Sequence, residues 1–394
     1  MVISMRKIII LLIGSLALFL VYNGTNSKTE NVINLDNNYE MNGVFVSYID
    51  INRYIKSNDI NTSKNNIKKM INNISEMGLN TIILQVRSFS DAIYYSDIYP
   101  WSSVISDKEG IDPGYDVLEF YIEEAKKKKI DVYAWINPYR VRTNEDISGI
   151  CEDNPAYQYI GTDKLYISDG IFYNPSKKET LNLILTGVEE IIKKYSVKGI
   201  LFDDYFYPSS DCDLLDYEEY LKSNTYMDID SYHFMIINEM IKKVHDLCKS
   251  YNVIFGVSPD GNMENNYNSN FADIKTWINN RYIDFIMPQL YYGFYNDNKP
   301  YLNTFESWHD LVLDNIDFYV ALAFYKVGLF DKYAGNGSNE WIDNDDVIMR
   351  EIIVGRGYAK YKGFALFRYG YLFDSQLYTS VTEGEKENIK KIVN

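Results

Sequence analysis

The sequence predicts a single (β/α)8 TIM barrel with extended loops after several strands, and three observations support this prediction. Eight apolar, strand-like runs alternate with amphipathic helical patterns along the chain. Each run is too apolar to face water on either side, which is typical of a parallel sheet covered by helices. Eight is also the number of parallel strands that closes a barrel of this kind.

A doubly wound open sheet is the alternative arrangement of alternating strands and helices. It would place a glycine-rich phosphate loop directly after the first strand. The two candidate glycine pairs, Gly335-Asn336-Gly337 and Gly355-Arg356-Gly357, lie late in the chain and in the wrong context. We therefore predict one barrel over residues 41–394, without an internal repeat or a second domain.

The predicted strands and helices follow one another regularly. In chain order, the strands cover residues 43–50, 80–87, 131–138, 199–208, 253–261, 283–292, 317–328 and 363–372. The first helical pattern, residues 63–78, has apolar residues three and four positions apart and ends at Gly78. The second begins at Asp116, and the third opens with Ser176 and Glu179, the spacing of a capping box. Further helical patterns cover residues 232–250, 271–279, 305–313, 345–353 and 383–393.

The first 40 residues differ from the rest of the chain. Arg6 and Lys7 precede an apolar run from Ile8 to Tyr22, whose length suits the core of a signal peptide better than a membrane span of about 20 residues. No clear cleavage site follows, so an uncleaved N-terminal anchor is the alternative. We expect residues 1–22 to be a signal peptide or anchor and residues 23–40 a flexible tether. The protein would then be extracytoplasmic, either secreted or anchored to the cell membrane.

Charge and composition exclude several functional classes. The chain has 39 basic and 55 acidic residues, a net charge of −16, and no basic stripe, which argues against binding to nucleic acid or an anionic membrane surface. The three cysteines are widely spaced and predict neither a disulfide framework nor a zinc motif. The three histidines do not make the paired spacing of a metal site. We expect no metal and no other cofactor.

The stretch GILFDDYFYP, residues 199–208, places two adjacent carboxylates at the end of a predicted strand. Such a pair costs several kcal/mol to bury unless it is hydrogen-bonded or used. Because successive strand residues face opposite ways, Asp203 and Asp204 are not expected to point into the barrel mouth together. We predict that Asp203 faces the site and that Asp204 supports it by bonding backbone amides or Arg140.

Polar and aromatic residues gather at the other strand ends, where barrel enzymes carry their catalytic groups. Aromatic faces beside amide, guanidinium and carboxylate groups suit a sugar, which has an apolar face and a rim of hydroxyls. The candidates for binding the sugar are Arg87, Trp101, Asn137, Tyr139, Arg140, Asp204, Tyr205, Gln289, Tyr291, Lys326 and Arg368.

Several long motifs resemble the glycosyl hydrolase-like family 10, a group of exported bacterial barrel proteins. They are QVRSFSDAIYYSDIYPWSS, AWINPYRV, GILFDDYFYP, MPQLYYGF, ALAFYKVG and ALFRYGY, in this order along the chain. The resemblance implies a barrel glycosidase that acts on a polysaccharide, with Asp203 as the catalytic carboxylate. Two positions depart from the family pattern: Leu201 stands where many relatives have a histidine, and Asp260 fills a position that often lacks a carboxylate.

We therefore expect a glycoside hydrolase that acts on a bacterial envelope polysaccharide or one containing amino sugars. Glycosidic hydrolysis usually needs two carboxyl groups, separated by about 5–5.5 Å for retention or about 6.5–9.5 Å for inversion. Asp203 is the first, and Asp260 and Asp91 are the candidates for the second. A non-catalytic envelope-glycan binding protein on the same barrel is the alternative. A metal-dependent deacetylase would need histidine ligands that the sequence does not provide.

Overall fold

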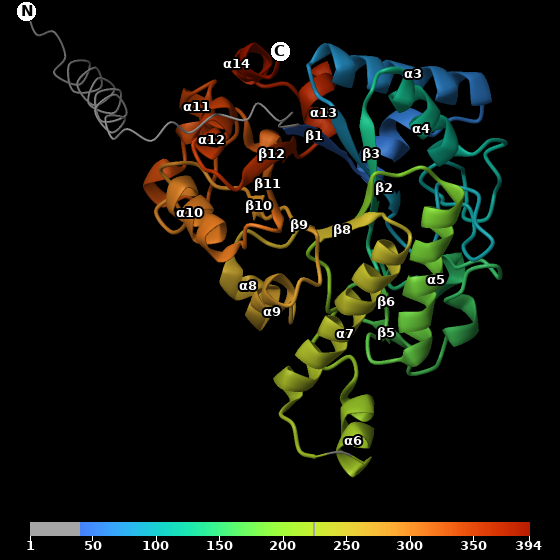
Figure 1. The fold of residues 1–394 in the computed structure, drawn as a ribbon. Helices are drawn as coiled ribbons and strands as arrows, with labels where there is room; N and C mark the ends of the chain where they lie inside the picture. Colours follow the sequence, from blue (N-terminus) through green and yellow to red (C-terminus); the bar gives the residue numbers. More distant parts are fainter. Residues whose placement is uncertain (1–39, 224) are drawn as a thin grey trace, which may run out of the picture. The chain divides into compact units, whose positions relative to one another are not determined.

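Eight parallel strand positions close into a barrel in the computed structural model, which describes residues 40–223 and 225–394 (Figure 1). The strands are β1 (Met41–Val46), β2 (Thr81–Arg87), β3 (Asp131–Ile136), β7 (Gly199–Phe202), β8 (Ile254–Val257), β9 (Phe285–Ile286) with β10 (Gln289–Leu290), β11 (Asp317–Leu322) and β12 (Tyr361–Leu366). The ring closes because β9 pairs in parallel with both β8 and β11. The predicted TIM-barrel fold is confirmed.

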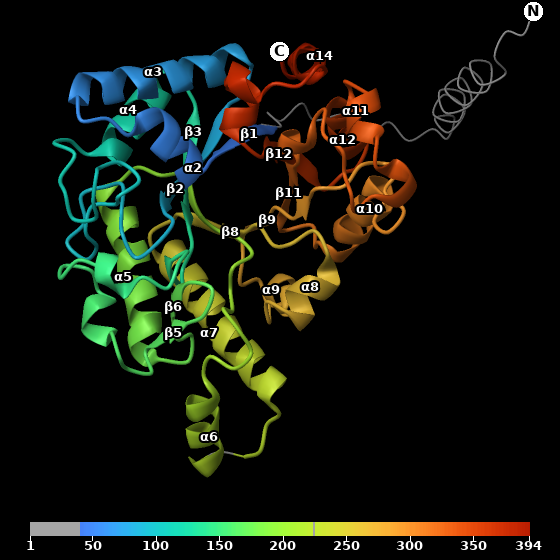
Figure 2. The ribbon, with the colours of Figure 1, turned by 180° about the vertical axis from the view of Figure 1, so that it is seen from behind.

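Helices surround the ring of strands (Figures 1 and 2). Their bounds are α2 (Tyr48–Asp50), α3 (Ile60–Glu76), α4 (Val117–Lys127), α5 (Lys178–Lys194), α6 (Leu214–Ser223), α7 (Ile229–Ser250), α8 (Met263–Asn268), α9 (Ile274–Asn279), α10 (Tyr301–Leu311), α11 (Glu340–Asp343), α12 (Val347–Arg356), α13 (Tyr369–Phe373) and α14 (Thr382–Val393). A π-helical turn, Ile51–Ile55, follows α2. α6 lies outside the ring, where Tyr217 packs against Tyr232 of α7 with ring centroids 5.3 Å apart.

The helix starts follow local hydrogen bonding, with one correction to the prediction. The Asp59 side chain accepts a hydrogen bond from the Thr62 N–H at the start of α3, as capping requires. The capping box predicted at Ser176 and Glu179 is wrong. α5 begins at Lys178, the Ser176 hydroxyl instead donates to Asp213, and Glu179 pairs with Lys164 at 2.7 Å.

The strands are shorter than the apolar runs predicted. β7 ends at Phe202 rather than Pro208, and β11 ends at Leu322 and is followed by a short 3-10 turn, Phe324–Lys326. The residues beyond each strand form loops at the mouth of the barrel. The loop after β3 carries a small antiparallel sheet of β4 (Arg140–Arg142), β5 (Leu165–Ile167) and β6 (Ile171–Tyr173).

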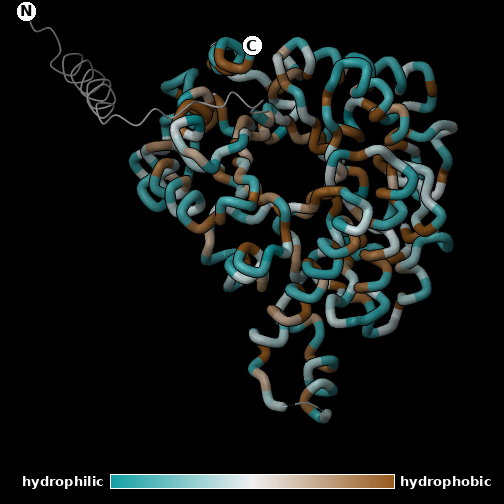
Figure 3. Tube along the Cα trace, in the orientation of Figure 1, coloured by the Kyte–Doolittle hydropathy of each residue, from teal (hydrophilic) through white to brown (hydrophobic). Residues whose placement is uncertain are grey.

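The apolar residues form two layers. Alternate residues of the barrel strands, including Phe45, Ile83, Trp135, Leu201 and Tyr319, make a cluster inside the ring. The other strand faces pack against the helices in a larger cluster. Figure 3 shows hydrophobic residues mainly along the strands and hydrophilic residues along the outer helices. Leu201, the departure from the family pattern, thus contributes an apolar side chain to the barrel interior.

The predicted leader, residues 1–22, and all of the predicted tether except Glu40 lie outside the described residues. Across residues 40–223 and 225–394, no helix is both long enough and apolar enough to cross a membrane.

Two buried carboxyl groups where α12 meets α14 make the stability of the fold depend on pH. Glu385 of α14 is fully buried and accepts a hydrogen bond of 2.9 Å from the Met349 N–H of α12. Burial raises the pKa of Glu385 from 4.5 to about 7, and burial together with the charge of Glu385 raises the pKa of Glu351. The folded protein therefore holds protons that the unfolded chain has lost. The contribution of this pair to stability is greatest below the unfolded pKa and is lost as the pH rises through about 7.

We expect Glu385→Gln to raise the free energy of unfolding at about pH 8 by roughly 1–3 kcal/mol, because the amide avoids the cost of ionising a buried group. The difference should vanish at about pH 4, where the carboxyl is protonated in both states. Urea denaturation at the two pH values measures it. Glu383→Gln, at a carboxylate 64% exposed on the same helix, is the control. A Glu385 variant no more stable than the wild type at about pH 8 would contradict the raised pKa.

Candidate active site

A cavity of about 310 Å³ opens at the mouth of the barrel, beyond the carboxyl ends of the strands. Its walls come from nearly every part of the ring, as expected for an active site in this fold. The lining residues are Phe45, Ser47, Tyr48, Ile49, Gln85, Trp135, Arg140, Asp203, Asp204, Tyr205, Ser258, Gln289, Tyr291, Tyr325 and Phe367. Among these described lining residues, Asp203 and Asp204 are the only carboxylates.

Asp203 lies one residue beyond β7 and is 4% exposed. Asn137, just beyond the neighbouring strand β3, places its Nδ2 2.7 Å from Oδ1 and 2.6 Å from Oδ2 of Asp203. Trp135 of β3 donates its indole N–H to Oδ2 at 3.0 Å. These donors stabilise a carboxylate that is nearly removed from water. Asp203 therefore lies in the cavity wall, on the face that the alternation predicted.

Asp204 corrects the prediction that the two carboxylates face opposite ways, because it also lines the cavity. The strand ends at Phe202, so the alternation of a strand no longer fixes the direction of the next residues. The side-chain partner of Asp204 is Gln289, whose Nε2 donates to Oδ1 at 3.0 Å, rather than Arg140, which was one of the two predicted kinds of partner beside backbone amides.

Different neighbouring groups act on the pKa of each of the two carboxyl groups. Burial raises the pKa of Asp203, but the charge of Arg140 and the hydrogen bonds from Asn137 and Trp135 oppose this rise. Burial, reinforced by the negative charge of Asp203, raises the pKa of Asp204 to about 7. Burial thus raises both pKa values, and Asp203 has the larger set of groups that oppose the rise.

Arg140, whose charge acts on Asp203, packs against aromatic rings that follow three different strands. Its guanidinium carbon lies 5.1 Å from the ring centroids of both Phe89 and Tyr205 and 5.8 Å from that of Tyr48. Its Nε donates to the Ser88 carbonyl oxygen at 3.1 Å. The attraction between the cation and these aromatic faces holds the guanidinium in place.

Aromatic rings also form the floor of the cavity. The centroid of Phe45 lies 5.5 Å from that of Trp135 and 5.6 Å from that of Phe367. Tyr291 packs on Phe367 at 5.7 Å and on Tyr325 at 5.6 Å. Burial raises the pKa of Tyr291 well above its usual value, so its phenol remains a hydrogen-bond donor. An apolar floor below polar groups suits the C–H face of a sugar.

Several lining residues were not among the predicted candidates. Gln85 of β2 is the most informative, because its Oε1 accepts from the Tyr48 N–H at 2.8 Å and its Nε2 donates to Asn137 Oδ1 at 2.6 Å. This contact turns the amino group of Asn137 toward Asp203. The period-two pattern could have revealed Gln85, since Ile83 and Gln85 share a face of β2 with the barrel interior.

Arg87, predicted to bind the sugar, lies outside the cavity. The register between β2 and β3 shifts between Gln85 and Arg87, and such a bulge turns the following residue to the other face. The Arg87 guanidinium therefore lies between the strands and α5, 4.5 Å from the ring centroid of Tyr99. Gly187 of α5 leaves room for it, because a Cβ there would lie 2.1 Å from Arg87 Nη1.

The two candidates for a second catalytic carboxylate also lie outside the cavity lining. Asp91 is buried in the loop after β2, where burial raises its pKa to about 7 and Ser102 provides a hydrogen bond. Asp260 accepts from the Asn262 N–H at 2.7 Å and from Asn265 Nδ2 at 3.0 Å at the start of α8. The charge of Asp260 contributes to the raised pKa of Asp204.

The remaining predicted residues divide between the cavity and its surroundings. Arg140, Asp204, Tyr205, Gln289 and Tyr291 line the cavity, and Asn137 contacts it through Asp203. The others, which do not line it, are Tyr139, Trp101, Lys326 and Arg368. Lys326 donates to the Tyr291 carbonyl oxygen at 2.8 Å and pairs with Asp331 at 2.7 Å, whereas Arg368 pairs with Asp50.

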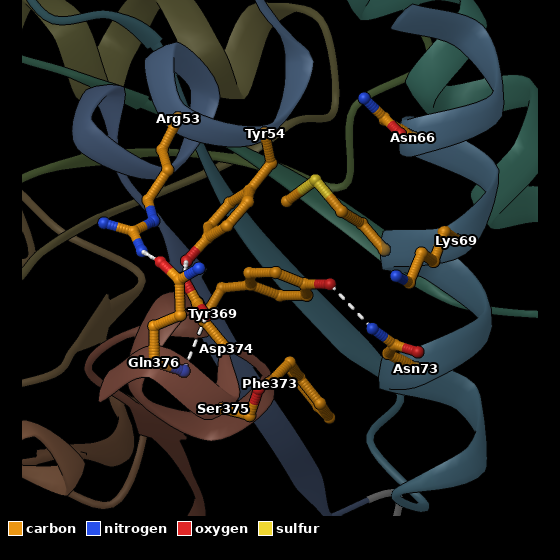
Figure 4. Close-up of a pocket in the computed structure, with 11 residues that line it drawn as sticks. Arg53, Tyr54, Asn66, Lys69, Asn73, Tyr369, Phe373, Asp374, Ser375 and Gln376 are labelled. Carbon is orange, nitrogen blue, oxygen red and sulfur yellow. Dashed lines mark hydrogen bonds and ion pairs between the residues drawn. The ribbon is translucent and has the colours of Figure 1, made fainter. Parts of the chain in front are cut away.

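A second hollow, of about 410 Å³, lies between α3, the π-helical turn and α13 (Figure 4). Asn73 donates to the Tyr369 hydroxyl at 2.8 Å on one side, and Arg53 pairs with Asp374 at 2.6 Å on the other. Asp374 is the only carboxylate among its described lining residues, and hydrogen bonds and the charge of Arg53 lower its pKa despite partial burial. This hollow therefore offers no carboxyl group poised to donate a proton, unlike the mouth of the barrel.

Comparison with known proteins identifies relatives that match most of the chain. The family model described as glycosyl hydrolase-like 10 matches residues 40–339. Glycosyl hydrolase YngK of Bacillus subtilis (strain 168) is 30% identical over 332 residues, which cover 78% of this chain and 63% of YngK. Glycosyl hydrolase DigH of Escherichia coli (strain K12) is 30% identical over 341 residues, covering 79% of this chain and 77% of DigH. The chain thus spans less than two thirds of the length of YngK.

Solved structures share the fold at low sequence identity. The glycoside hydrolase domain of PgaB (BpsB) from Bordetella bronchiseptica aligns with a TM-score of 0.56 and 11% identity, over 85% of this chain and 96% of that domain. The endo-1,4-beta-mannanase from Rhizomucor miehei aligns with a TM-score of 0.51 and 14% identity, over 89% and 95%. These likenesses show the barrel fold alone.

The position of Arg87 can be tested through Gly187. We expect Gly187→Ala to lower the free energy of unfolding by about 1–3 kcal/mol, because the added methyl group would collide with the buried guanidinium and with Tyr99. Without that contact, the same change in a helix would stabilise by about 0.5–1 kcal/mol. Urea denaturation measures the difference. Thr186→Ala, at the exposed neighbouring position, is the control. If the Gly187→Ala variant were more stable than the wild type, the Arg87 guanidinium could not lie against Gly187.

Proposed function

Because the chain belongs to the glycosyl hydrolase-like 10 family, we propose that it is a glycoside hydrolase of a bacterial envelope polysaccharide or one containing amino sugars. One observation carries the proposal: Asp203 and Asp204 lie together in a cavity with an aromatic floor at the mouth of the barrel. Acid/base cleavage of a glycosidic bond needs carboxyl groups beside a sugar-binding surface, one of them with a raised pKa.

The two carboxyl groups take different roles in the proposed reaction. Asp204, whose pKa is raised to about 7, is the general acid that protonates the leaving glycosidic oxygen. Asp203 acts in its ionised form in this proposal, and its negative charge stabilises the positive charge that develops at the anomeric carbon in the transition state. Asn137 and Trp135 hold the Asp203 carboxylate in place, so it need not reorganise during the reaction.

The surroundings of the cavity support a polysaccharide substrate. The rings of Phe45, Trp135 and Phe367 offer an apolar surface, and neighbouring amide and guanidinium groups can bond hydroxyls. The net charge of −16 favours neutral or cationic polymers over anionic ones. We further propose an extracytoplasmic location, in which residues 1–22 act as an export signal or membrane anchor.

Removal of either carboxylate tests the function. We expect Asp203→Asn and Asp204→Asn each to lower the release of reducing ends from envelope polysaccharides by at least about 100-fold, while leaving the thermal unfolding transition in place. Asp310→Asn, at a side chain 82% exposed on the barrel exterior, is the matched control and should keep full activity. Full activity in the Asp203 variant would overturn the assignment. Glycan binding by the wild type without any product would instead support a non-catalytic glycan-binding protein.

The pH profile tests the role of Asp204. A general acid must be protonated, so kcat/KM should fall as the pH rises through about 7. Gln289→Leu removes the hydrogen bond that stabilises the ionised form of Asp204, and the midpoint of this fall should therefore move to higher pH. The measurement is the pH dependence of kcat/KM for both proteins. A midpoint that does not move would show that the fall of kcat/KM at higher pH does not come from the ionisation of Asp204.

A further inference from the structure

We propose that the substrate supplies its own nucleophile, the carbonyl oxygen of a 2-acetamido group on the sugar whose glycosidic bond is cleaved. This inference rests on the proposed function and adds a substrate class to it, because the sugar at the cleavage point must then be N-acetylated. Asp203 positions the acetamido group, and Asp204 transfers the proton.

The first observation is the placement of the two carboxylates. When two protein carboxylates cleave a glycosidic bond, they flank it, with one beside the leaving oxygen and the other across the anomeric carbon. Asp203 and Asp204 are consecutive residues with Cα atoms about 3.8 Å apart, so both come from one point on the rim. No third carboxylate belongs to the described cavity lining, and Asp91 and Asp260 are bonded within their own loops. The described lining of the cavity thus offers an acid but no carboxylate across from it.

The second observation is the bonding of Asp203. Both of its oxygens lie within hydrogen-bond distance of the Asn137 amino group, and Oδ2 also accepts from Trp135. These bonds draw electron density from the oxygens and fix them, which makes Asp203 a poor nucleophile. A carboxylate has about four acceptor sites, however, so it can take one more donor. An acetamido N–H is such a donor, and a negative charge beside it increases the nucleophilicity of the carbonyl oxygen.

The third observation is the cavity floor next to Asp203. Trp135 bonds the carboxylate through its indole N–H and packs edge-on against Phe45, with centroids 5.5 Å apart. The acetamido methyl group would lie on this apolar surface while its N–H faces Asp203. Tyr291 lines the same cavity and keeps its phenolic proton, so it can donate to the carbonyl oxygen and orient it. The cavity therefore matches all three parts of an acetamido group.

The reaction balances without a co-reactant other than water. The carbonyl oxygen forms a bond to the anomeric carbon, the bond to the leaving oxygen breaks, and the proton of Asp204 moves to that oxygen. The result is a fused oxazolinium ring whose N–H is held by Asp203. Water then attacks the anomeric carbon and gives a proton to Asp204, and the ring opens to restore the acetamido group. Two inversions at one carbon leave its configuration retained.

Product analysis tests the substrate class. Partially N-acetylated chitosan, and the envelope polysaccharide cleaved in the hydrolysis assay, present both acetylated and free amino sugars. Mass spectrometry of the products after isotopic labelling of the reducing end identifies the sugar at each cut. We expect every new reducing end to be N-acetylated. De-N-acetylated reducing ends in proportion to their share of the polymer would overturn the inference while leaving the hydrolase function intact.

A binding experiment tests the nucleophile without requiring turnover. N-acetylglucosamine thiazoline is a stable mimic of the fused ring, and calorimetry can compare it with N-acetylglucosamine. We expect the wild-type protein to bind the thiazoline at least about 100-fold more tightly, as a mimic of a transient state should bind. Asp203→Asn should lose this preference, and the exposed control Asp310→Asn should keep it.

The outcomes separate the two proposals. A wild-type protein without preference for the thiazoline overturns the inference, whatever its activity. A protein that releases products but shows no preference remains a hydrolase with another nucleophile. A protein that neither releases products from any envelope polysaccharide nor prefers the thiazoline fails both proposals.

Discussion

The hydrogen bonding of the buried Asp203 carboxylate is the constraint on which the site depends. Burying this charge without partners would cost several kcal/mol, and the chain meets that demand with a relay of side-chain amides. The Tyr48 N–H donates to Gln85, Gln85 donates to Asn137, and Asn137 donates to Asp203. Each amide oxygen is occupied by the previous donor, so each amino group must point to the next acceptor. The relay crosses from the end of β1 through β2 and β3 to the end of β7. The orientation of the carboxylate therefore depends on how these four neighbouring strands are arranged in the barrel.

The features that the sequence predicted correctly are those that depend on regular secondary structure. Eight apolar runs identified all eight strand positions, because these follow from uninterrupted strand geometry. The period-two pattern also gave the cavity face for Asp203, although Asp203 lies one residue beyond β7. The pattern did not place Asp204 or Arg87 correctly, since a strand end at Phe202 and a register shift after Gln85 break the alternation at those points. Neither break has a clear local signal: no glycine or proline marks the end of β7 or the bulge in β2. Both depend on how neighbouring strands pair, which a single sequence does not contain.

A raised pKa does not by itself locate the chemistry of this protein. Asp91, Asp204 and Glu385 all have pKa values raised to about 7, and burial is the first cause for each. Asp91 and Glu385 lie away from the mouth cavity, bonded by neighbouring serine or backbone groups. A neighbouring carboxylate adds to the rise in each case: Asp203 for Asp204, Glu109 for Asp91 and Asp346 for Glu385. Asp204 differs because it lines the cavity. Position in a sugar-sized hollow, rather than a raised pKa alone, is therefore the feature that distinguishes the candidate acid.

Arg140 connects the charges of Asp203 and Asp204 to the loops at the mouth of the barrel. Its positive charge opposes the effect of burial on the pKa of Asp203. Yet its position depends on loops: β4 begins at Arg140, and its guanidinium is held by Phe89 after β2 and Tyr205 after β7. A change in any of these loops would move the cation relative to the pair. The loops therefore shape the cavity and also position the charge that lowers the pKa of Asp203, so a change in these loops would affect both the shape of the cavity and the pH dependence of the site.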